Sequence, residues 1–213
     1  MIELQNIIPI PLQEAQLNPE TQIWKQHLTF EKGKNYLVKA PSGKGKSTFL
    51  HLIYGLRTDY QGQINWNGQA LPTFQEKDWV TIRQEQLAIV FQNLRLFPQL
   101  SALENIQINI NAPFHGQAQQ IREMAKRLHI ENLLDKPCQH LSYGQQQRVA
   151  IIRALMQPFS FLLLDEPFSH LDSENIEAAA KLITERVAAQ KASLILVSLE
   201  NDYEMLFDEI LIL

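Results

Sequence analysis

The stretch Ala40-Pro41-Ser42-Gly43-Lys44-Gly45-Lys46-Ser47-Thr48 decides how the rest of the chain is interpreted. It follows the apolar residues 36–38, which predict a short buried strand, and it precedes residues 49–54, which predict a helix. Glycines let backbone N–H groups turn toward one anion, and the start of a helix adds unpaired N–H groups and the positive end of its dipole. A strand, a glycine-rich turn and a helix in this order predict a phosphate-binding loop.

The residue types within this stretch match the pattern G-x-x-x-x-G-K-[ST], with Ala40 in place of the first glycine. In such a loop the lysine reaches the β- and γ-phosphates of a nucleotide and the hydroxyl that follows it binds Mg²⁺, roles that fall to Lys46 and Ser47. The candidate nucleotide contacts are Ala40, Pro41, Ser42, Gly43, Lys44, Gly45, Lys46, Ser47 and Thr48. On this segment alone, the alternative is an ordinary surface turn rich in glycine and lysine.

The whole chain has the composition of a soluble globular protein. It contains 213 residues, of which 45% are hydrophobic and 20% charged, and its formal net charge is −4. This length suits one domain with a core of its own, and the acidic balance argues against a general nucleic-acid-binding protein. Cys138 is the single cysteine, which excludes an internal disulfide framework and fits a reducing compartment.

The sequence shows no targeting or membrane-spanning segment. The first residues lack a basic region followed by an apolar one, so no signal peptide is apparent. No apolar run approaches the ~20 residues that a membrane-spanning helix requires. We therefore expect a cytoplasmic protein that does not insert into the membrane.

Strands and helices are predicted to alternate along most of the chain. We predict strands at residues 2–7, 22–30, 36–38, 63–66, 87–91, 159–164, 192–197 and 208–213, and helices at 46–54, 102–130, 142–156 and 174–190. This alternation predicts an α/β fold with a mainly parallel sheet, an antiparallel β portion near the front and an inserted helical subdomain. We expect one domain over residues 1–213, with a core of about 1–92 and 158–213 and a helical subdomain of about 93–157.

Residues 161–167 are the candidate second half of the nucleotide site. Here four apolar residues precede two carboxylates and a proline. A buried strand whose carboxyl end opens into a site has this pattern. Asp165 is the candidate metal-binding carboxylate, and Glu166 is placed to polarise the water that attacks the γ-phosphate. Alone, the motif is equally typical of a buried strand that ends in a solvated turn.

The octapeptide LSYGQQQR at residues 141–148 lies between these two segments and resembles the signature motif of ATP-binding cassette (ABC) ATPases. Ser142 as N-cap and Gly144 in the first turn would leave a helix start open to an anion. The resemblance implies that Ser142, Gly144 and Gln145 contact the γ-phosphate of an ATP held by a second subunit, so that two chains enclose two ATP molecules head to tail. Tyr143 replaces the usual first glycine.

Two further segments resemble landmarks of the same family, and the resemblance covers nearly the whole chain. Residues 90–93 resemble the Q-loop, whose Gln92 would reach Mg²⁺ and the attacking water. Residues 169–172 resemble the D-loop, whose Asp172 would cross the dimer interface. The implied catalytic residues are Glu166 and Gln92, and the implied metal ligands are Ser47, Gln92 and Asp165.

The sequence departs from the family pattern at two places. The turn after the strand at 192–197 carries Leu199 where the family has a switch histidine, and none of the six histidines lies nearby in the sequence. Leucine can neither donate to a phosphate nor hold a water, so hydrolysis is expected to be slow.

No aromatic residue precedes Ile23 to stack on adenine, which predicts weak discrimination between bases. Trp24 is the candidate substitute, although its position suits a strand core better.

The family resemblance implies an ATP-hydrolysing subunit of a bacterial ABC transporter, most similar to the lipoprotein-release, macrolide-efflux and cell-division group. ATP and Mg²⁺ are the implied cofactors. The implied partners are a second copy of the chain and integral membrane subunits, with the chain peripheral on the inner face of the membrane.

A degenerate nucleotide-binding regulatory module with little hydrolysis remains the alternative, favoured by Leu199. A soluble ABC ATPase of DNA repair or translation usually needs two cassettes or a long coiled coil, and a kinase would leave residues 141–148 without a role.

Overall fold

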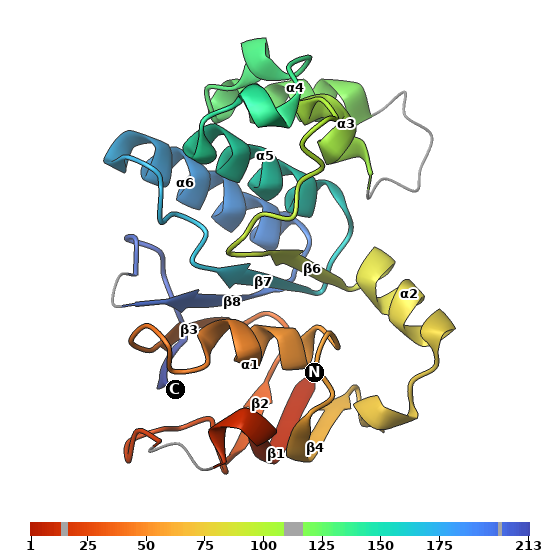
Figure 1. Cartoon of the computed structure of the whole chain (residues 1–213), viewed down its shortest axis with the longest axis vertical. Coiled ribbons are helices and arrows are strands. Elements are labelled where there is room, and N and C mark those ends of the chain that lie inside the picture. The colour runs from red at the N-terminus through yellow and green to blue at the C-terminus, as the bar shows by residue number, and fades with distance from the viewer. Residues whose placement is uncertain (14–16, 109–116, 200–201) are drawn as a thin grey trace.

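The computed structural model describes residues 1–13, 17–108, 117–199 and 202–213. Two sheets and a group of helices form successive layers along the longest axis of the molecule (Figure 1). One sheet is parallel, with strand order β6-β7-β8-β3-β9, and the other is antiparallel, with order β2-β1-β4-β5. The predicted combination of a mainly parallel sheet with an antiparallel β portion is confirmed.

The strands of the parallel sheet are β3 (Asn35–Lys39), β6 (Leu87–Val90), β7 (Phe161–Asp165), β8 (Ser193–Ser198) and β9 (Glu209–Ile212). The antiparallel sheet contains β1 (Ile2–Pro9), β2 (His27–Phe30), β4 (Tyr60–Trp66) and β5 (Gln69–Ala70). The helices of the described residues are α1 (Lys46–Ile53), α2 (Glu76–Glu85), α3 (Ala102–Gln107), α4 (Gln117–Arg127), α5 (Tyr143–Met156) and α6 (Ser173–Ala189).

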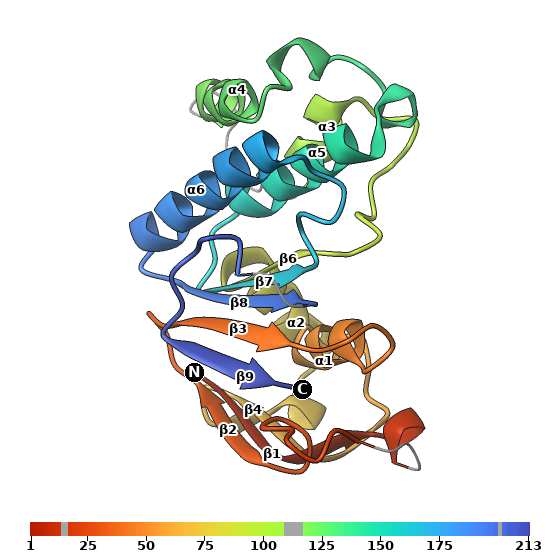
Figure 2. The ribbon, with the colours of Figure 1, turned by 90° about the vertical axis from the view of Figure 1, so that its left-hand side faces the viewer.

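Both faces of the parallel sheet are buried, and successive residues of a strand point to opposite faces. Leu162 and Leu164 of β7 belong to the hydrophobic cluster that includes α5 and α6, whereas Phe161 and Leu163 belong to the cluster that includes α1 and the antiparallel sheet. Figure 2 shows the parallel strands between these two layers. This double burial explains why the strands are nearly continuous apolar runs.

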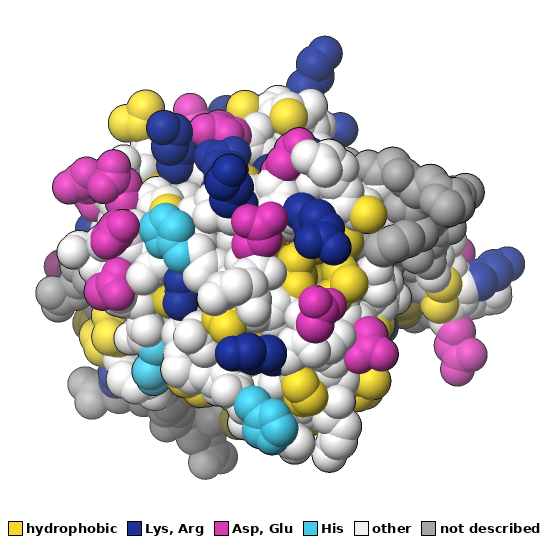
Figure 3. Space-filling view, turned by 90° about the horizontal axis from the view of Figure 1, so that it is seen from above, with side chains coloured by type: hydrophobic (Ala, Val, Ile, Leu, Met, Phe, Trp, Pro, Cys, Tyr) yellow, Lys and Arg dark blue, Asp and Glu magenta, His cyan; other side chains and the backbone are white. Residues whose placement is uncertain are grey.

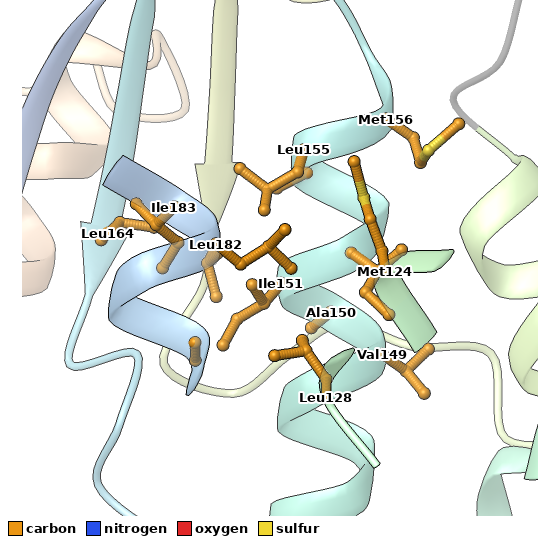
Figure 4. Close-up of a cluster of buried hydrophobic side chains, with 14 of the residues drawn as sticks. Met124, Leu128, Val149, Ala150, Ile151, Leu155, Met156, Leu164, Leu182 and Ile183 are labelled. Carbon is orange, nitrogen blue, oxygen red and sulfur yellow. The ribbon is translucent and has the colours of Figure 1, made fainter. Parts of the chain in front are cut away.

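The helical end of the molecule is held by side chains from α4, α5 and α6. Ile151 of α5 and Leu128 lie on the side of α5 that faces Leu182 of α6, and Met124 of α4 lies on its other side (Figure 4). Seen from above this end, Lys and Arg side chains alternate with Asp and Glu side chains (Figure 3). The charges on this visible face are therefore of mixed sign.

Three details differ from the sequence prediction. Residues 22–26 form a turn in which the Thr21 hydroxyl accepts hydrogen bonds from the N–H groups of Ile23 and Trp24, so the second strand begins only at His27. Trp24 is buried within this turn and not within a strand, and it meets Phe49 edge to face. The expected helix at 102–130 corresponds to α3 and α4, with part of it outside the described residues.

Helix α2 was not predicted because only one of its ten residues, Ile82, is buried, so the helix has little apolar periodicity. A local signal was present, since the Asp78 carboxylate accepts a hydrogen bond from the Gln75 backbone N–H, as expected at a helix start. Arg83 of α2 donates to the carbonyl oxygens of Tyr54 and Gly55 and so ties α2 to the end of α1.

Candidate nucleotide-binding site

The predicted phosphate-binding loop connects the carboxyl end of β3 to the start of α1. Gly43 and Gly45 adopt φ angles of 77° and 96°, which lie in the left-handed region that glycine tolerates best. Gly45 is the N-cap of α1, so its conformation turns the chain directly into the helix. The loop therefore has the backbone form needed to direct N–H groups of the helix start at an anion.

Lys46 is the most tightly held charged group of the loop. Its Nζ donates to the carbonyl oxygens of Ala40 and Pro41 at 3.0 and 3.1 Å, and it lies 3.1 Å from Oε1 of Glu166. The two charged side chains are only 6% and 15% exposed. The structure thus joins the phosphate-loop lysine to the candidate general base.

Asp165 ends β7, which β8 separates from β3 in the sheet, and is 1% exposed. Neither of its carboxylate oxygens has a hydrogen-bond partner in the described part of the chain. Burial raises the pKa of this carboxyl group, while nearby Ser47 and Lys46 act in the opposite direction. An unpaired, buried carboxylate is costly unless something else satisfies it, which is a reason to expect a cation here.

Gln92 follows β6 and connects the two halves of the site. Its Oε1 accepts a hydrogen bond from the Ser47 hydroxyl at 3.3 Å, and its Nε2 donates to Oε2 of Glu166 at 3.3 Å. The hydroxyl, the amide oxygen and the Asp165 carboxylate form an all-oxygen donor set, which suits Mg²⁺. No group of three His, Cys, Asp or Glu residues capable of holding a metal occurs among the described residues.

Glu166 itself has a φ of 48°, which is uncommon for a residue with a side chain and is typical of strained positions at functional sites. Its N–H donates to the Val197 carbonyl of β8, which fixes the strained peptide. A hollow of about 250 Å³ borders this side chain. The hollow is lined by Leu12, Ser42, Gly43, Gly45, Lys46, Ser47, Thr48, Gln92 and Glu166.

The predicted signature helix α5 begins with Ser142 as N-cap. The Ser142 hydroxyl accepts from the Gln145 N–H at 3.3 Å, and the Gln145 side chain accepts from the Ser142 N–H at 2.9 Å. A Cβ on Gly144 would lie 2.7 Å from the His170 carbonyl oxygen, so the backbone of α5 approaches residues 169–172 closely. The structure thereby brings the signature and D-loop segments together.

Asp172 is the N-cap of α6 and accepts hydrogen bonds from the backbone and side-chain nitrogens of Asn175. These bonds lower the pKa of its carboxyl group. In this single chain Asp172 does not belong to the hollow around Lys46 and Glu166, and Ser142, Gly144 and Gln145 do not line it either.

Leu199 follows β8, whose last residue Ser198 accepts a hydrogen bond from the N–H of Ala40 at the start of the phosphate loop. The side chain of Leu199 is 47% exposed. The missing histidine therefore falls on the same sheet edge as the phosphate-binding loop.

Sequence reasoning missed three residues of this region. Gln147 is buried and donates to the Glu166 carbonyl, while its side-chain oxygen accepts from the His170 N–H. Tyr143 contacts Gln92, and Leu12 borders the hollow. A run of glutamines in the sequence does not indicate that one of them, Gln147, contacts Glu166 and His170. The replacement of a glycine by Tyr143 was visible in the sequence.

Comparisons with known proteins agree with this geometry. The profile of the ABC transporter family matches residues 23–169. The glucose import ATP-binding protein GlcV of Saccharolobus solfataricus is 35% identical over 81% of this chain, which spans about half (49%) of that protein. The lipoprotein-releasing system ATP-binding protein LolD of Buchnera aphidicola is 34% identical over 82% of this chain and 77% of its own length.

Solved structures show the same fold. The dimeric structure of a bacterial ABC transporter cassette matches with a TM-score of 0.79 at 26% identity and covers 92% of this chain and 88% of its own. A post-hydrolysis structure of that cassette, bound to ADP and Pi, matches with a TM-score of 0.80. The sequence-based predictions of fold and family are therefore confirmed, and the chain belongs to the ABC transporter family, as one of its ATP-binding cassettes.

Proposed function

We propose that this chain hydrolyses ATP at the site around Lys46 and Glu166 and that hydrolysis powers membrane subunits of an ABC transporter. The observation that carries the proposal is the convergence of Lys46, Gln92 and Glu166. They come from three separate parts of the sequence, and their side chains meet within hydrogen-bond distance at one edge of the parallel sheet. Ligands of α/β proteins bind at this edge, outside the carboxyl ends of the strands.

Each residue of the site has a chemical role in this proposal. Lys46 binds the β- and γ-phosphates, supported by the backbone N–H groups at the start of α1. Glu166 accepts a proton from the attacking water while the new oxygen–phosphorus bond forms and the bond to the leaving ADP oxygen breaks. Because the Lys46 ammonium contacts the Glu166 carboxylate, a γ-phosphate that binds Lys46 would replace the carboxylate there and leave it available to the water.

Ser47, Gln92 and Asp165 are proposed to hold Mg²⁺. The support is the unpaired, buried carboxylate of Asp165 together with the oxygens of the other two side chains. When bound, the ion neutralises charge on the β- and γ-phosphate oxygens. Asp165 contributes by fixing a carboxylate at the end of a rigid strand, and Gln92 contributes by orienting the water beside Glu166.

A second copy of the chain would complete the site. Ser142, Gly144 and Gln145 do not line the hollow around Lys46, and in the proposal they contact the ATP held by the partner subunit. Asp172 crosses the same interface. Matches to dimeric cassettes support this head-to-tail arrangement, and closure of the two copies around ATP is the proposed mechanical step.

The proposal places the chain on the inner face of the membrane, bound to integral membrane subunits. Within the described ranges, no helix combines the length and apolar character that crossing a bilayer requires. One matching solved chain is part of an ABC transporter complex. We assign residues 93–157 as the helical lobe and residues 1–92 and 158–213 as the core that binds ATP, within one domain.

The test is phosphate release by the purified chain with Mg-ATP, compared with that of Glu166→Gln. Turnover in the wild-type chain and its loss in the variant are expected, with ATP binding retained in both. A wild-type chain that binds ATP and releases no phosphate, alone and with its membrane partner, would contradict the proposal.

A second function is favoured by one observation, the exposed Leu199 at the sheet edge where the family has a histidine. Leucine cannot hold the attacking water, so the chain would close on ATP without efficient hydrolysis and act as a regulatory module. Binding of ATP that drives dimerisation without turnover would support this function over the first.

A further inference from the structure

Tyr143 makes a contact that joins two functional segments of the site. Its hydroxyl donates a hydrogen bond of 2.8 Å to the backbone carbonyl of Gln92. The bond joins the first residue of α5 to Gln92, which lies two residues after the end of β6 at Val90. Its ring also lies against His170, with ring centroids 4.3 Å apart and an interplanar angle of 54°.

The Gln92 peptide accepts this bond, and the Gln92 side chain connects the two halves of the site. The Gln92 amide contacts the Ser47 hydroxyl and the Glu166 carboxylate, each at 3.3 Å. The next residues have strained backbone, since Leu94 and Arg95 adopt φ angles of 59° and 46°. Arg153 donates to the carbonyl oxygens of Leu94 and Arg95, and the Tyr143 hydroxyl holds the loop at its first peptide, that of Gln92.

We infer that Tyr143 is a positioning residue that acts through Gln92. Its hydroxyl fixes the Gln92 peptide and so holds the amide between Ser47 and Glu166. The inference rests on the proposed function, in which this amide orients the attacking water. Because Tyr143 begins α5, it also transmits the position of the signature helix to the catalytic carboxylate of the same chain.

The size of the effect follows from the environment of the bond. Tyr143 is 41% exposed, so water competes for the Gln92 carbonyl and the net strength of the bond is that of an ordinary neutral hydrogen bond. We expect Tyr143→Phe, which keeps the ring on His170 and removes only the hydroxyl, to lower kcat about two- to tenfold. The KM for Mg-ATP should not change, because Tyr143 does not line the hollow around Lys46.

Tyr36→Phe is the matched control. The Tyr36 hydroxyl accepts a hydrogen bond of the same length, 2.8 Å, from the Glu31 backbone N–H, remote from the signature helix. This variant should lower the melting temperature and leave kcat unchanged. Tyr143→Phe should instead lower kcat and leave the melting temperature unchanged, because its bond is exposed but acts on the site.

A double-mutant cycle with Gln92→Ala tests whether Tyr143 acts through that side chain. The loss of the hydroxyl should have no effect on kcat once the Gln92 amide is absent. A wild-type kcat in Tyr143→Phe, or an equal fall in both backgrounds, would overturn the inference.

Amide hydrogen exchange of residues 93–96 provides a readout without turnover. Nucleotide-free Tyr143→Phe should exchange these amides faster than the wild-type chain and Tyr36→Phe, and an unchanged rate would overturn the inference. If the wild-type chain does not hydrolyse ATP, the proposed function fails, and the exchange comparison still decides whether Tyr143 holds the Gln92 loop.

Discussion

The ammonium of Lys46 lies 3.1 Å from the carboxylate of Glu166, so the group proposed to bind the γ-phosphate and the group proposed to activate water neutralise each other. The pair is largely buried, and both partners have further hydrogen bonds, to the Ala40 and Pro41 carbonyls and to Gln92. Any anion that binds Lys46 must compete with Glu166. In the structure these two groups are therefore paired with each other.

The first prediction follows from this competition. Glu166→Gln removes the charge that competes for Lys46, so the variant should bind ATP about two- to fivefold more tightly than the wild-type chain. Equilibrium binding of ATP in the absence of Mg²⁺ checks this without hydrolysis. The matched control is Glu174→Gln on the exposed side of α6, which should leave the affinity unchanged. Equal or weaker binding by Glu166→Gln would show that the pair does not oppose nucleotide binding.

The second prediction concerns the buried carboxyl group of Asp165. Its pKa is raised by burial, so its contribution to stability is present below the ordinary Asp pKa and is lost as pH rises through the raised value. Without metal, Asp165→Asn should therefore melt at a higher temperature than the wild-type chain at neutral pH. The difference should shrink as pH falls toward the ordinary Asp value of 3.8.

Thermal melts across this pH range with a chelator check the prediction, and the exposed Asp135→Asn is the control. With Mg-ATP the order should reverse, because the wild-type carboxylate then gains a cation and the amide does not. A variant that is less stable than the wild-type chain at neutral pH without metal would show that the carboxylate is satisfied in some other way.

Much of the site could be predicted because its signals are local. The phosphate-binding loop needs glycine at particular φ angles and a lysine at the helix start, and all of these lie within one short stretch. Asp165 was recognisable because a parallel strand buried on both faces is an apolar run that ends where the site begins. The parallel sheet followed from the alternation of strands and helices.

The parts that could not be predicted depend on distances between loops. No pattern in the sequence indicates that the Tyr143 hydroxyl reaches the Gln92 carbonyl, or that Gln147 spans from the Glu166 carbonyl to His170. The turn at 22–26 was mistaken for strand because its apolar residues, Ile23 and Trp24, are buried in a hydrogen-bonded turn. Burial alone does not distinguish these two conformations.

A third prediction concerns the exposed Leu199. Leu199→His would place a side chain that donates and accepts hydrogen bonds at the sheet edge beside the phosphate loop, and kcat should rise at least about tenfold. Phosphate release at saturating Mg-ATP is the measurement. Leu206→His, at an even more exposed leucine, serves as control and should not change kcat. No gain in Leu199→His would mean that the site holds its water without this residue.

A fourth prediction uses the close approach at Gly144. In an ordinary helix a Gly→Ala change stabilises by about 0.5–1 kcal/mol. Here the new Cβ would lie 2.7 Å from the His170 carbonyl oxygen, and a backbone atom cannot move aside as easily as a side chain. Gly144→Ala should therefore lower the free energy of unfolding by about 1–3 kcal/mol. Denaturant titration tests the sign, and an increase in stability would show that α5 and the D-loop separate freely.

The last prediction concerns the base-binding end of the hollow. Leu12 lines the hollow together with the phosphate loop, and a Cβ on Gly45 would meet its Cδ1 at 2.9 Å, so this leucine covers the loop where a base could rest. An apolar, non-aromatic side chain offers contact without stacking, so ATP and GTP should bind with similar affinity. Leu12→Tyr should tighten binding of both nucleotides at least about fivefold, because stacking on a ring contributes ~1–3 kcal/mol for any base.

Competition between ATP and GTP against a fluorescent ATP analogue measures both effects in one experiment. Leu17→Tyr is the control, because Leu12 borders both the hollow around Lys46 and a second hollow beside Trp24, whereas Leu17 borders only the second. If Leu12→Tyr leaves both affinities unchanged while Leu17→Tyr raises them, the base lies in the hollow beside Trp24. The buried Trp24 ring would then be near enough to the base to explain how the chain binds a nucleotide without an earlier aromatic residue.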